Sequence, residues 1–372
     1  MKICFTCYLE EYKPKGNVLQ FLNLLKAIDQ KVDQLPGKQQ KKAVIDCVLP
    51  FEFDSAKHRM SFRHVHFYKA TNLAKKVAEL DKKKNYDFLF VRGRKEAIDL
   101  LRENRKTAKK LLFLTINYNL NSPANITELR HIFDNSRVMF FQSVPLAERF
   151  KAYVCENGLS PDEASKKIGV LPQFVTPYPE QKLAAIRRAI PPQLIQVGVI
   201  RPRYGLSVAV RAIRLIRKQV PKARLHVLHP SIVPKYRKKA RALLKRRGVK
   251  DHGMKSAWET KRMIVKNGIG LALIYDNTPD KTPSHAYLSR VLEYMSLGVP
   301  VITTPTKGNI HLLGQGYPLF VQDENDILRC YLKLLIPEFY QQMSKYVYQI
   351  GQQFLTQNAV NEFWSVLNSR KG

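Results

Sequence analysis

The stretch Ser289–Thr304, SRVLEYMSLGVPVITT, contains a helical apolar pattern, a glycine-proline turn and a β-branched run in direct succession. The glycine and proline end the helix, and the run that follows them is typical of a buried parallel strand. A helix that leads into such a strand predicts an α/β domain. The helical part also holds one acid, Glu293, in a chain with 63 Lys and Arg but only 30 Asp and Glu.

The same alternation of apolar runs and helical patterns extends outward over all 372 residues. It indicates parallel sheets with crossover helices, and the length is sufficient for two such domains. The expected strands are KICFTCY, AVIDCVL, YDFLFVRG, LLFLTIN and VMFFQS in the first half, and LIQVGVI, RLHVLHP, IGLALIY, PVITTP and PLFVQ in the second.

Prolines gather between residues 172 and 192, as in a linker between domains. We therefore expect a Rossmann-like domain over 1–180 and a second one over 181–337. A helical pattern in 338–372 predicts C-terminal helices that pack back on the first domain. The two sheets would then face each other across a cleft, and ligands of such sheets bind beyond the carboxyl ends of the strands.

The composition also bears on the compartment. No apolar run approaches the roughly 20 residues that cross a bilayer, and Glu10 and Glu11 come too early for a secretory signal. The five cysteines are scattered, and the CxxC spacing of Cys4 and Cys7 has no second pair or histidine cluster to complete a metal site. We expect a cytoplasmic protein with reduced thiols and no metal site.

The net charge of +33 is the unusual bulk property. Such a field attracts polyanions, namely nucleic acid, an anionic membrane face or a phosphate-bearing polymer. Two basic helical patterns carry the charge beside apolar residues, IDLLRENRKTAKKLLF in the first half and VPKYRKKARALLKRRGV in the second. In the first of them, the candidates for membrane or acceptor contact are Arg105, Lys106, Lys109 and Lys110.

One loop of the second half has the composition of an anion site. In QVGVIRPRYGLSVAVRAIRLI, a buried strand leads into a basic loop with Arg201 and Arg203, then Gly205 and an amphipathic helix. Amides at the helix start and two guanidiniums can bind a phosphate or diphosphate. A βα loop with incidental arginines has the same composition, so the loop alone leaves both interpretations open.

The helix of the opening stretch follows the next candidate loop. The strand IGLALIY enters DNTPDKTPSHAYLSR, and the helix then begins near Ser289 and Arg290. A carboxylate one turn into such a helix, Glu293, can accept both hydroxyls of a ribose, while the serine and arginine hold phosphates. Since both loops belong at the same edge of one sheet, together they favour a nucleotide site over a carboxylate that merely stabilises the helix start.

These two segments resemble a known family, the retaining, nucleotide-sugar-dependent glycosyltransferases of GT-B fold and of the group 1, or family 4, type. VGVIRPRYGLSVAVRAIRLIRKQVPKARLHVLH and SRVLEYMSLGVPVITTP carry the resemblance, which covers most of the chain and is sharper in its second half. It implies that Glu293 contacts the ribose. It also implies that Arg201 or Arg203, together with Arg290, neutralises the leaving nucleoside diphosphate.

The resemblance extends to the first half at two points. Gly16, within KPKGNVLQFLNLL, fits the glycine loop that lets the donor approach the first helix, and LLFLTINYN resembles the strand end that places a polar residue, here Asn117, near the transferred sugar. The sequence departs from the family pattern as well. His285 replaces a common acid, Tyr204 a common lysine, and Asn117 a common histidine, so Asn117 and His285 are only candidates for a catalytic role.

The resemblance implies a hexosyltransferase-like enzyme that moves a sugar from a UDP- or GDP-sugar, with retention, to a cell-surface glycan, a lipid-linked acceptor or an anionic polymer. Such an enzyme would build envelope polysaccharide at the inner face of the plasma membrane, with no cofactor and no obligatory metal. The transition state resembles that of glycoside hydrolysis, so stabilisation of the departing diphosphate by fixed cations is the main requirement.

Two alternatives remain open at the level of sequence. A protein of the same fold with a degenerate nucleotide cleft would account for the three departures from the family pattern. A nucleic-acid-binding protein would account for the charge, and Leu159–Val175 is similar to a two-helix DNA-reading motif. Against it, the sequence has no RRM aromatic signature and no zinc-finger spacing, and Ser160 with Glu163 is explained by a capping box.

Overall fold

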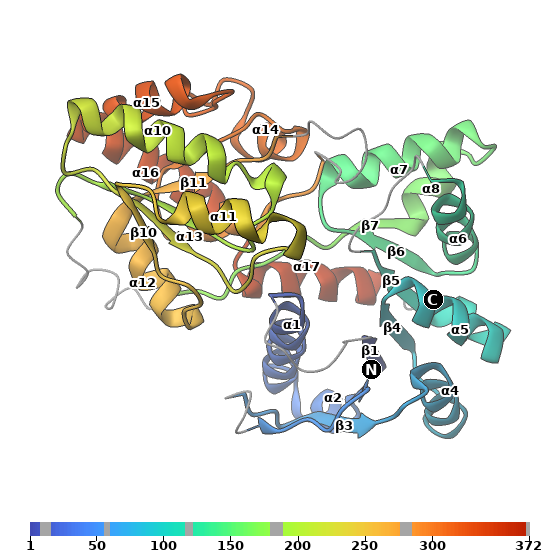
Figure 1. Cartoon of the computed structure of the whole chain (residues 1–372). Coiled ribbons are helices and arrows are strands. Elements are labelled where there is room, and N and C mark those ends of the chain that lie inside the picture. Colours follow the sequence, from blue (N-terminus) through green and yellow to red (C-terminus); the bar gives the residue numbers. More distant parts are fainter. Residues whose placement is uncertain (8–15, 56–59, 116–121, 179–188, 276–284, 370–372) are drawn as a thin grey trace. The chain divides into compact units, whose positions relative to one another are not determined.

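The computed structural model describes residues 1–7, 16–55, 60–115, 122–178, 189–275 and 285–369 (Figure 1). The chain divides into two compact units. The first contains residues up to Gln173 and the C-terminal stretch that begins at Thr356, and the second contains residues from Phe174 to Leu355.

In the described part of the first unit, seven strands form one parallel sheet in the order β3-β2-β1-β4-β5-β6-β7. The strands are β1 Lys2–Cys7, β2 Val44–Leu49, β3 Val65–Lys69, β4 Phe88–Arg92, β5 Leu111–Leu114, β6 Val138–Phe141 and β7 Ile168–Val170. The helices are α1 Gly16–Asp33, α2 Gly37–Lys41, α4 Leu73–Lys84, α5 Arg94–Glu103, α6 Pro123–Asp134, α7 Val144–Glu156, α8 Pro161–Lys167 and α17 Thr356–Ser369, with a 3₁₀ turn, η1, at Arg105–Lys110. The central strands are continuous apolar runs because helices cover both faces of a parallel sheet.

In the described part of the second unit, five strands form a parallel sheet in the order β10-β9-β8-β11-β12. The strands are β8 Gln193–Val197, β9 Leu225–Leu228, β10 Val249–Asp251, β11 Gly268–Ala272 and β12 Val301–Thr303. The helices are α10 Leu206–Gln219, α11 Arg237–Leu244, α12 Ala257–Asn267, α13 Ser289–Ser296, α14 Lys307–Leu313, α15 Glu324–Lys333 and α16 Pro337–Gln352, with 3₁₀ turns η2 at Pro202–Tyr204 and η3 at Pro234–Tyr236.

The two-unit α/β fold follows the sequence prediction, with four differences at the sheet edges. The short strands β3, β7 and β10 were not expected, and PLFVQ forms only an isolated bridge between Thr303 and Phe320. Edge strands are short and partly exposed, so their composition gives a weaker signal than that of a central strand.

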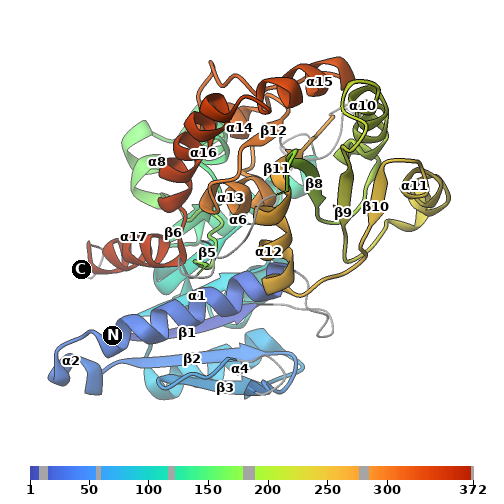
Figure 2. The same cartoon turned by 90° about the vertical axis from the view of Figure 1, so that its left-hand side faces the viewer.

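The C-terminal segment divides between the two units, whereas the sequence predicted that all of 338–372 packs on the first. Helix α16 packs on α13 in the second unit, where Ser344 Oγ donates a hydrogen bond to the Gly298 carbonyl oxygen at 2.6 Å. Only α17 belongs to the first unit. There its Phe363 ring lies 5.5 Å from the Phe90 ring and 5.6 Å from the Phe140 ring, and the helix runs beside α1 (Figure 2).

The two central strands of the second sheet fix the position of α13. A Cβ placed on Gly270 of β11 would lie 2.5 Å from the Tyr294 ring, so glycine makes room for this tyrosine of α13. The Tyr294 hydroxyl donates to the Ile195 carbonyl oxygen and accepts from the Val197 amide, each at 3.1 Å. Helix α13 is thereby held over β8 and β11, which are neighbours in the sheet.

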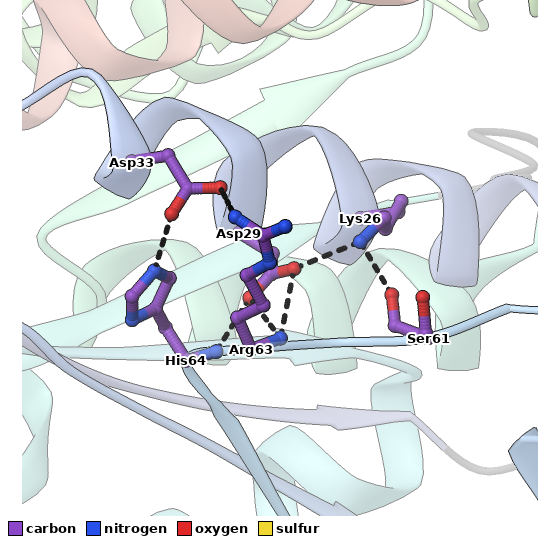
Figure 3. Close-up of polar contacts among 6 residues, drawn as sticks. All are labelled: Lys26, Asp29, Asp33, Ser61, Arg63 and His64. Atoms are coloured by element: carbon purple, nitrogen blue, oxygen red, sulfur yellow. Dashed lines mark hydrogen bonds and ion pairs between the residues drawn. The ribbon is translucent and has the colours of Figure 1, made fainter.

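In the first unit, one buried carboxylate ties α1 to the segment before β3 (Figure 3). Asp29 is fully buried and accepts hydrogen bonds from the backbone amides of Arg63, at 3.0 Å, and His64, at 2.7 Å. Lys26 Nζ lies 3.0 Å from the same carboxylate and also donates to the Ser61 carbonyl oxygen. The carboxylate thus satisfies backbone donors that would otherwise be buried unpaired.

We expect Asp29→Asn to lower the urea midpoint of the first unit by the equivalent of about 2 kcal/mol. The amide keeps the shape but loses the charge, and it turns a donor toward at least one backbone N–H, which is left unsatisfied. Asp33→Asn, one helical turn further on, is the matched control. Its carboxylate is 34% exposed and bonds mainly to the His64 ring, so a shift as large as that of Asp29→Asn would contradict the proposed anchor.

None of the described helices combines the length and the apolar character that a membrane span requires.

Candidate functional site

The carboxyl ends of β8 and β11 meet because these strands are neighbours, and the loops that follow them are packed together. Gly205, with a φ of +68°, precedes α10, and a Cβ there would lie 2.6 Å from Leu273 Cβ. The Tyr275 amide donates to the Arg203 carbonyl oxygen at 2.9 Å. A side chain at residue 205 would therefore separate the two loops, which explains the glycine in the basic loop.

Three guanidiniums converge on one aromatic ring at this edge. The Cζ atoms of Arg290, Arg203 and Arg201 lie 4.4, 5.4 and 5.8 Å from the centroid of the Tyr204 ring. Within the residues that the structure describes, none of the three forms an ion pair with a carboxylate. The ring attracts the cations through its negative face and holds together charges that otherwise repel one another.

Arg290 is the most constrained of the three. Its Nη2 donates to the Leu273 carbonyl oxygen at 2.8 Å, and its Nη1 lies 3.8 Å from the position of a Cβ on Gly198. Among the described residues, the Nε atoms of Arg203 and Arg290 are buried and have no hydrogen-bond partner. Burial lowers the pKa of Arg290, partly offset by Tyr204. Because a buried cation without an anion is costly, this geometry favours an anionic ligand with several oxygens.

Glu293 lies three residues beyond Arg290 on α13 and is partly exposed. Within the described part of the chain, its carboxylate makes no hydrogen bond and no ion pair. Burial raises the pKa of Glu293, and the charge of Lys261 opposes this shift. The carboxylate is therefore available as an acceptor for hydroxyl groups, at one helical turn from the guanidiniums.

Lys261 of α12 was not predicted from the sequence. Its side chain is buried and donates to the Thr176 carbonyl oxygen. Burial lowers the pKa of Lys261, whereas the Glu293 carboxylate raises it. No local pattern signals this pairing, because the two residues come from different helices and α12 reads as an ordinary amphipathic helix.

The other predicted residues of this site occupy separate positions. Ser289 is exposed at the first position of α13. His285 lies in the turn before α13, and the start of α14 packs so closely on this turn that a Cβ on Gly308 would collide with the Ala286 carbonyl. Asn117 lies outside the described residues. Gly16 begins α1 in the first unit.

The four basic residues that were predicted to contact a membrane or an acceptor differ in their exposure. Arg105, Lys106 and Lys109 are exposed on η1. Lys110 instead pairs with Asp81 at 3.0 Å and donates to Asn85 Oδ1 at 2.9 Å, so it joins η1 to α4 within the first unit. This engagement removes Lys110 from the freely exposed cations.

A second polar group lies at the carboxyl edge of the first sheet. Arg92 ends β4, and Thr115 and Gln142 directly follow β5 and β6; all three are buried. Gln173 Nε2 donates to Gln142 Oε1 at 3.2 Å. Among the described residues, Thr115 Oγ1 has no hydrogen-bond partner. The sequence contained a usable signal, since polar residues directly after apolar parallel strands mark this edge.

No protein-family model matches the sequence, and no curated protein matches it. Solved structures do match over nearly the whole chain. HepE (Alr3699) of Anabaena, solved with UDP and glucose, has a TM-score of 0.69 at 13% identity and covers 99% of this chain and 100% of its own. Sucrose-phosphate synthase of Thermosynechococcus elongatus has a TM-score of 0.71 at 13% identity, with 98% of each chain covered. A glycosyltransferase of Rickettsia africae has a TM-score of 0.69 at 12% identity, with 99% and 98% covered.

These similarities show that the chain has the GT-B fold, in which each of the two α/β units is built on a parallel sheet. The fold prediction from the sequence is thus confirmed.

Proposed function

We propose that this chain is a glycosyltransferase that takes its sugar from a UDP-sugar. The observation that carries the proposal is the cluster of Arg201, Arg203 and Arg290 around Tyr204, with Glu293 on the same helix as Arg290. A nucleoside diphosphate supplies the two groups that this arrangement requires, paired phosphates and a ribose diol. Neighbouring structures solved with UDP, and with UDP-glucose, support the choice of nucleotide.

In the proposed reaction, the bond between the sugar and the diphosphate breaks, a bond between the sugar and an acceptor hydroxyl oxygen forms, and the departing diphosphate takes up the hydroxyl proton. Negative charge grows on the departing phosphate as its bond to the sugar breaks. The three guanidiniums are already in place and partly desolvated, so they stabilise this charge with little reorganisation. Tyr204 limits the directions in which the arginines can turn. Glu293 accepts the ribose hydroxyls, and Lys261 helps to keep its carboxylate ionised.

The same proposal extends to the acceptor, the stereochemistry of the transfer and the location of the protein. We place the acceptor on the first unit, at the edge with Arg92, Thr115 and Gln142, where buried polar groups can bind hydroxyls. The exposed cations of η1 would attract a lipid-linked or anionic polymer acceptor of the cell envelope. Transfer would proceed with retention, without a metal, and at the cytoplasmic face of the membrane. NMR of the product tests retention, since an inverted anomeric configuration contradicts it.

A panel of UDP-, GDP-, ADP- and CDP-sugars in thermal unfolding tests the donor. A ligand at about 100 times its Kd adds about 2.7 kcal/mol to stability, and we expect this only for uridine nucleotides. The double variant Arg201→Gln, Arg203→Gln should lose the shift. Arg214→Gln, Lys218→Gln, which removes two exposed cations of α10, should retain it. Equal shifts in both double variants, or none in the wild type, would contradict the proposal.

A further inference from the structure

Residues 181–250 contain no aspartate or glutamate but are rich in lysine and arginine. Within this run, α11 and its flanking turns carry a set of exposed cations that we call the α11 face. Its members are Lys235, Arg237, Lys238, Lys239, Arg241, Lys245, Arg246 and Arg247. Helix α11 lies beside β9 and β10, at the edge of the second sheet (Figure 2).

The α11 face has no internal counter-charge. Within the described residues, none of its cations forms an ion pair, whereas Arg211 of the neighbouring α10 pairs with Glu324 at 2.8 Å. More positive charge lies next to the face. The pKa of Arg217 is lowered by burial first and then by Arg224 and Arg247. The repulsion within this cluster destabilises the isolated chain, and a polyanion on the face would remove it.

The apolar side of α11 faces the interior. Tyr236, Ala240 and Leu244 are buried, and the Tyr236 hydroxyl lies 3.0 Å from Ser207 Oγ. These side chains therefore cannot insert into a lipid layer. Tyr236 is also the only aromatic residue between 231 and 250, so the face offers no ring on which a nucleic-acid base could stack. What remains is an array of long, flexible cations.

We propose that the α11 face docks the chain on an anionic lipid surface by charge alone. Eight exposed cations on one short helix and its flanking turns fit an extended plane of headgroups better than a single polymer strand, which a groove would hold. Each lysine or arginine near such a surface strengthens partitioning about fivefold. Docking by this face is separate from the donor site, because it requires neither a nucleotide nor the three clustered arginines.

Vesicle sedimentation of the full chain tests the docking. Wild type should bind phosphatidylglycerol-rich vesicles, not phosphatidylcholine vesicles, and added salt should release it, since screening weakens surface charges. The triple variant Lys238→Glu, Lys239→Glu, Arg241→Glu should lose at least about 100-fold in partitioning. The matched control Lys75→Glu, Lys82→Glu, Lys83→Glu changes the net charge equally on exposed positions of α4 and should lose far less.

The outcomes separate the alternatives. Equal losses in the two triple variants would overturn the proposal in favour of net charge alone, and salt-resistant binding would overturn it in favour of apolar insertion. If the wild type binds duplex DNA but not vesicles, and the α11 variant loses the DNA binding, the partner is nucleic acid instead. Because the substitutions relieve the repulsion within the α11 face, the α11 variant should have a thermal midpoint at least as high as that of the wild type and should keep its response to UDP-sugar. A vesicle failure with a normal nucleotide response therefore overturns the docking only.

Discussion

Arg290→Met should reduce kcat for sugar transfer by at least about 100-fold, the scale on which enzymes lose rate when one preorganised oxyanion donor is removed. Arg290 approaches the Tyr204 ring more closely than Arg201 or Arg203 does, and its Nη2 bond to the Leu273 carbonyl fixes its direction. The loss should lie mainly in kcat, because the charge that Arg290 meets grows as the diphosphate departs. Steady-state kinetics with a UDP-sugar measures the split between kcat and KM.

The same variant should fold normally. Burial lowers the pKa of Arg290, which means that the folded protein keeps this cation at a cost, and methionine fills a similar volume without it. Arg290→Lys keeps the charge but not the planar fork, and should recover only part of the rate. Arg214→Met, on the exposed side of α10, is the control. Unchanged kcat in Arg290→Met, with an intact thermal midpoint, would remove Arg290 from the mechanism.

The loops of the second unit could be predicted from the sequence because their signals are local. Gly205 and the adjacent arginines lie between an apolar strand and an amphipathic helix, and Glu293 lies one turn into α13. The α/β pattern indicates a parallel sheet, and the carboxyl ends of parallel strands bring the two loops to the same edge. Such an inference needs only the spacing of the apolar residues along each element and the positions at which each element ends.

Contacts between distant elements could not be predicted in this way. Tyr204 was noted in the sequence only as a departure from a family pattern, yet its ring is where the three guanidiniums meet. The coupling of Lys261 to Glu293, and the bonds of Asp29 to the backbone before β3, depend on how helices sit on their sheets. Apolar periodicity shows which face of a helix is buried but not which polar atom it meets.

Glu293→Gln should lower the affinity for a UDP-sugar by about 100-fold and at the same time stabilise the free protein at neutral pH. The affinity falls because hydrogen bonds to a charged acceptor contribute about 1.5–3 kcal/mol each, and the neutral amide can replace only part of them. Stability rises because burial raises the pKa of Glu293, so the folded state disfavours its charged form. Titration calorimetry and thermal unfolding without ligand measure the two effects.

The raised pKa of Glu293 also predicts the direction in which folding stability changes with pH. Between the ordinary carboxyl pKa and the raised one, the folded chain binds more protons than the unfolded chain, so stability falls as pH rises through that window. Glu293→Gln should flatten this part of the curve. Glu324→Gln is a control with the opposite expected effect on stability. The hydrogen bond from Arg211 lowers the pKa of Glu324, so the folded state favours its charged form. Removal of this charge should destabilise the protein without changing its affinity for the donor. A Glu293→Gln protein that is less stable and still binds UDP-sugar would show that this carboxylate is a structural group rather than a ligand contact.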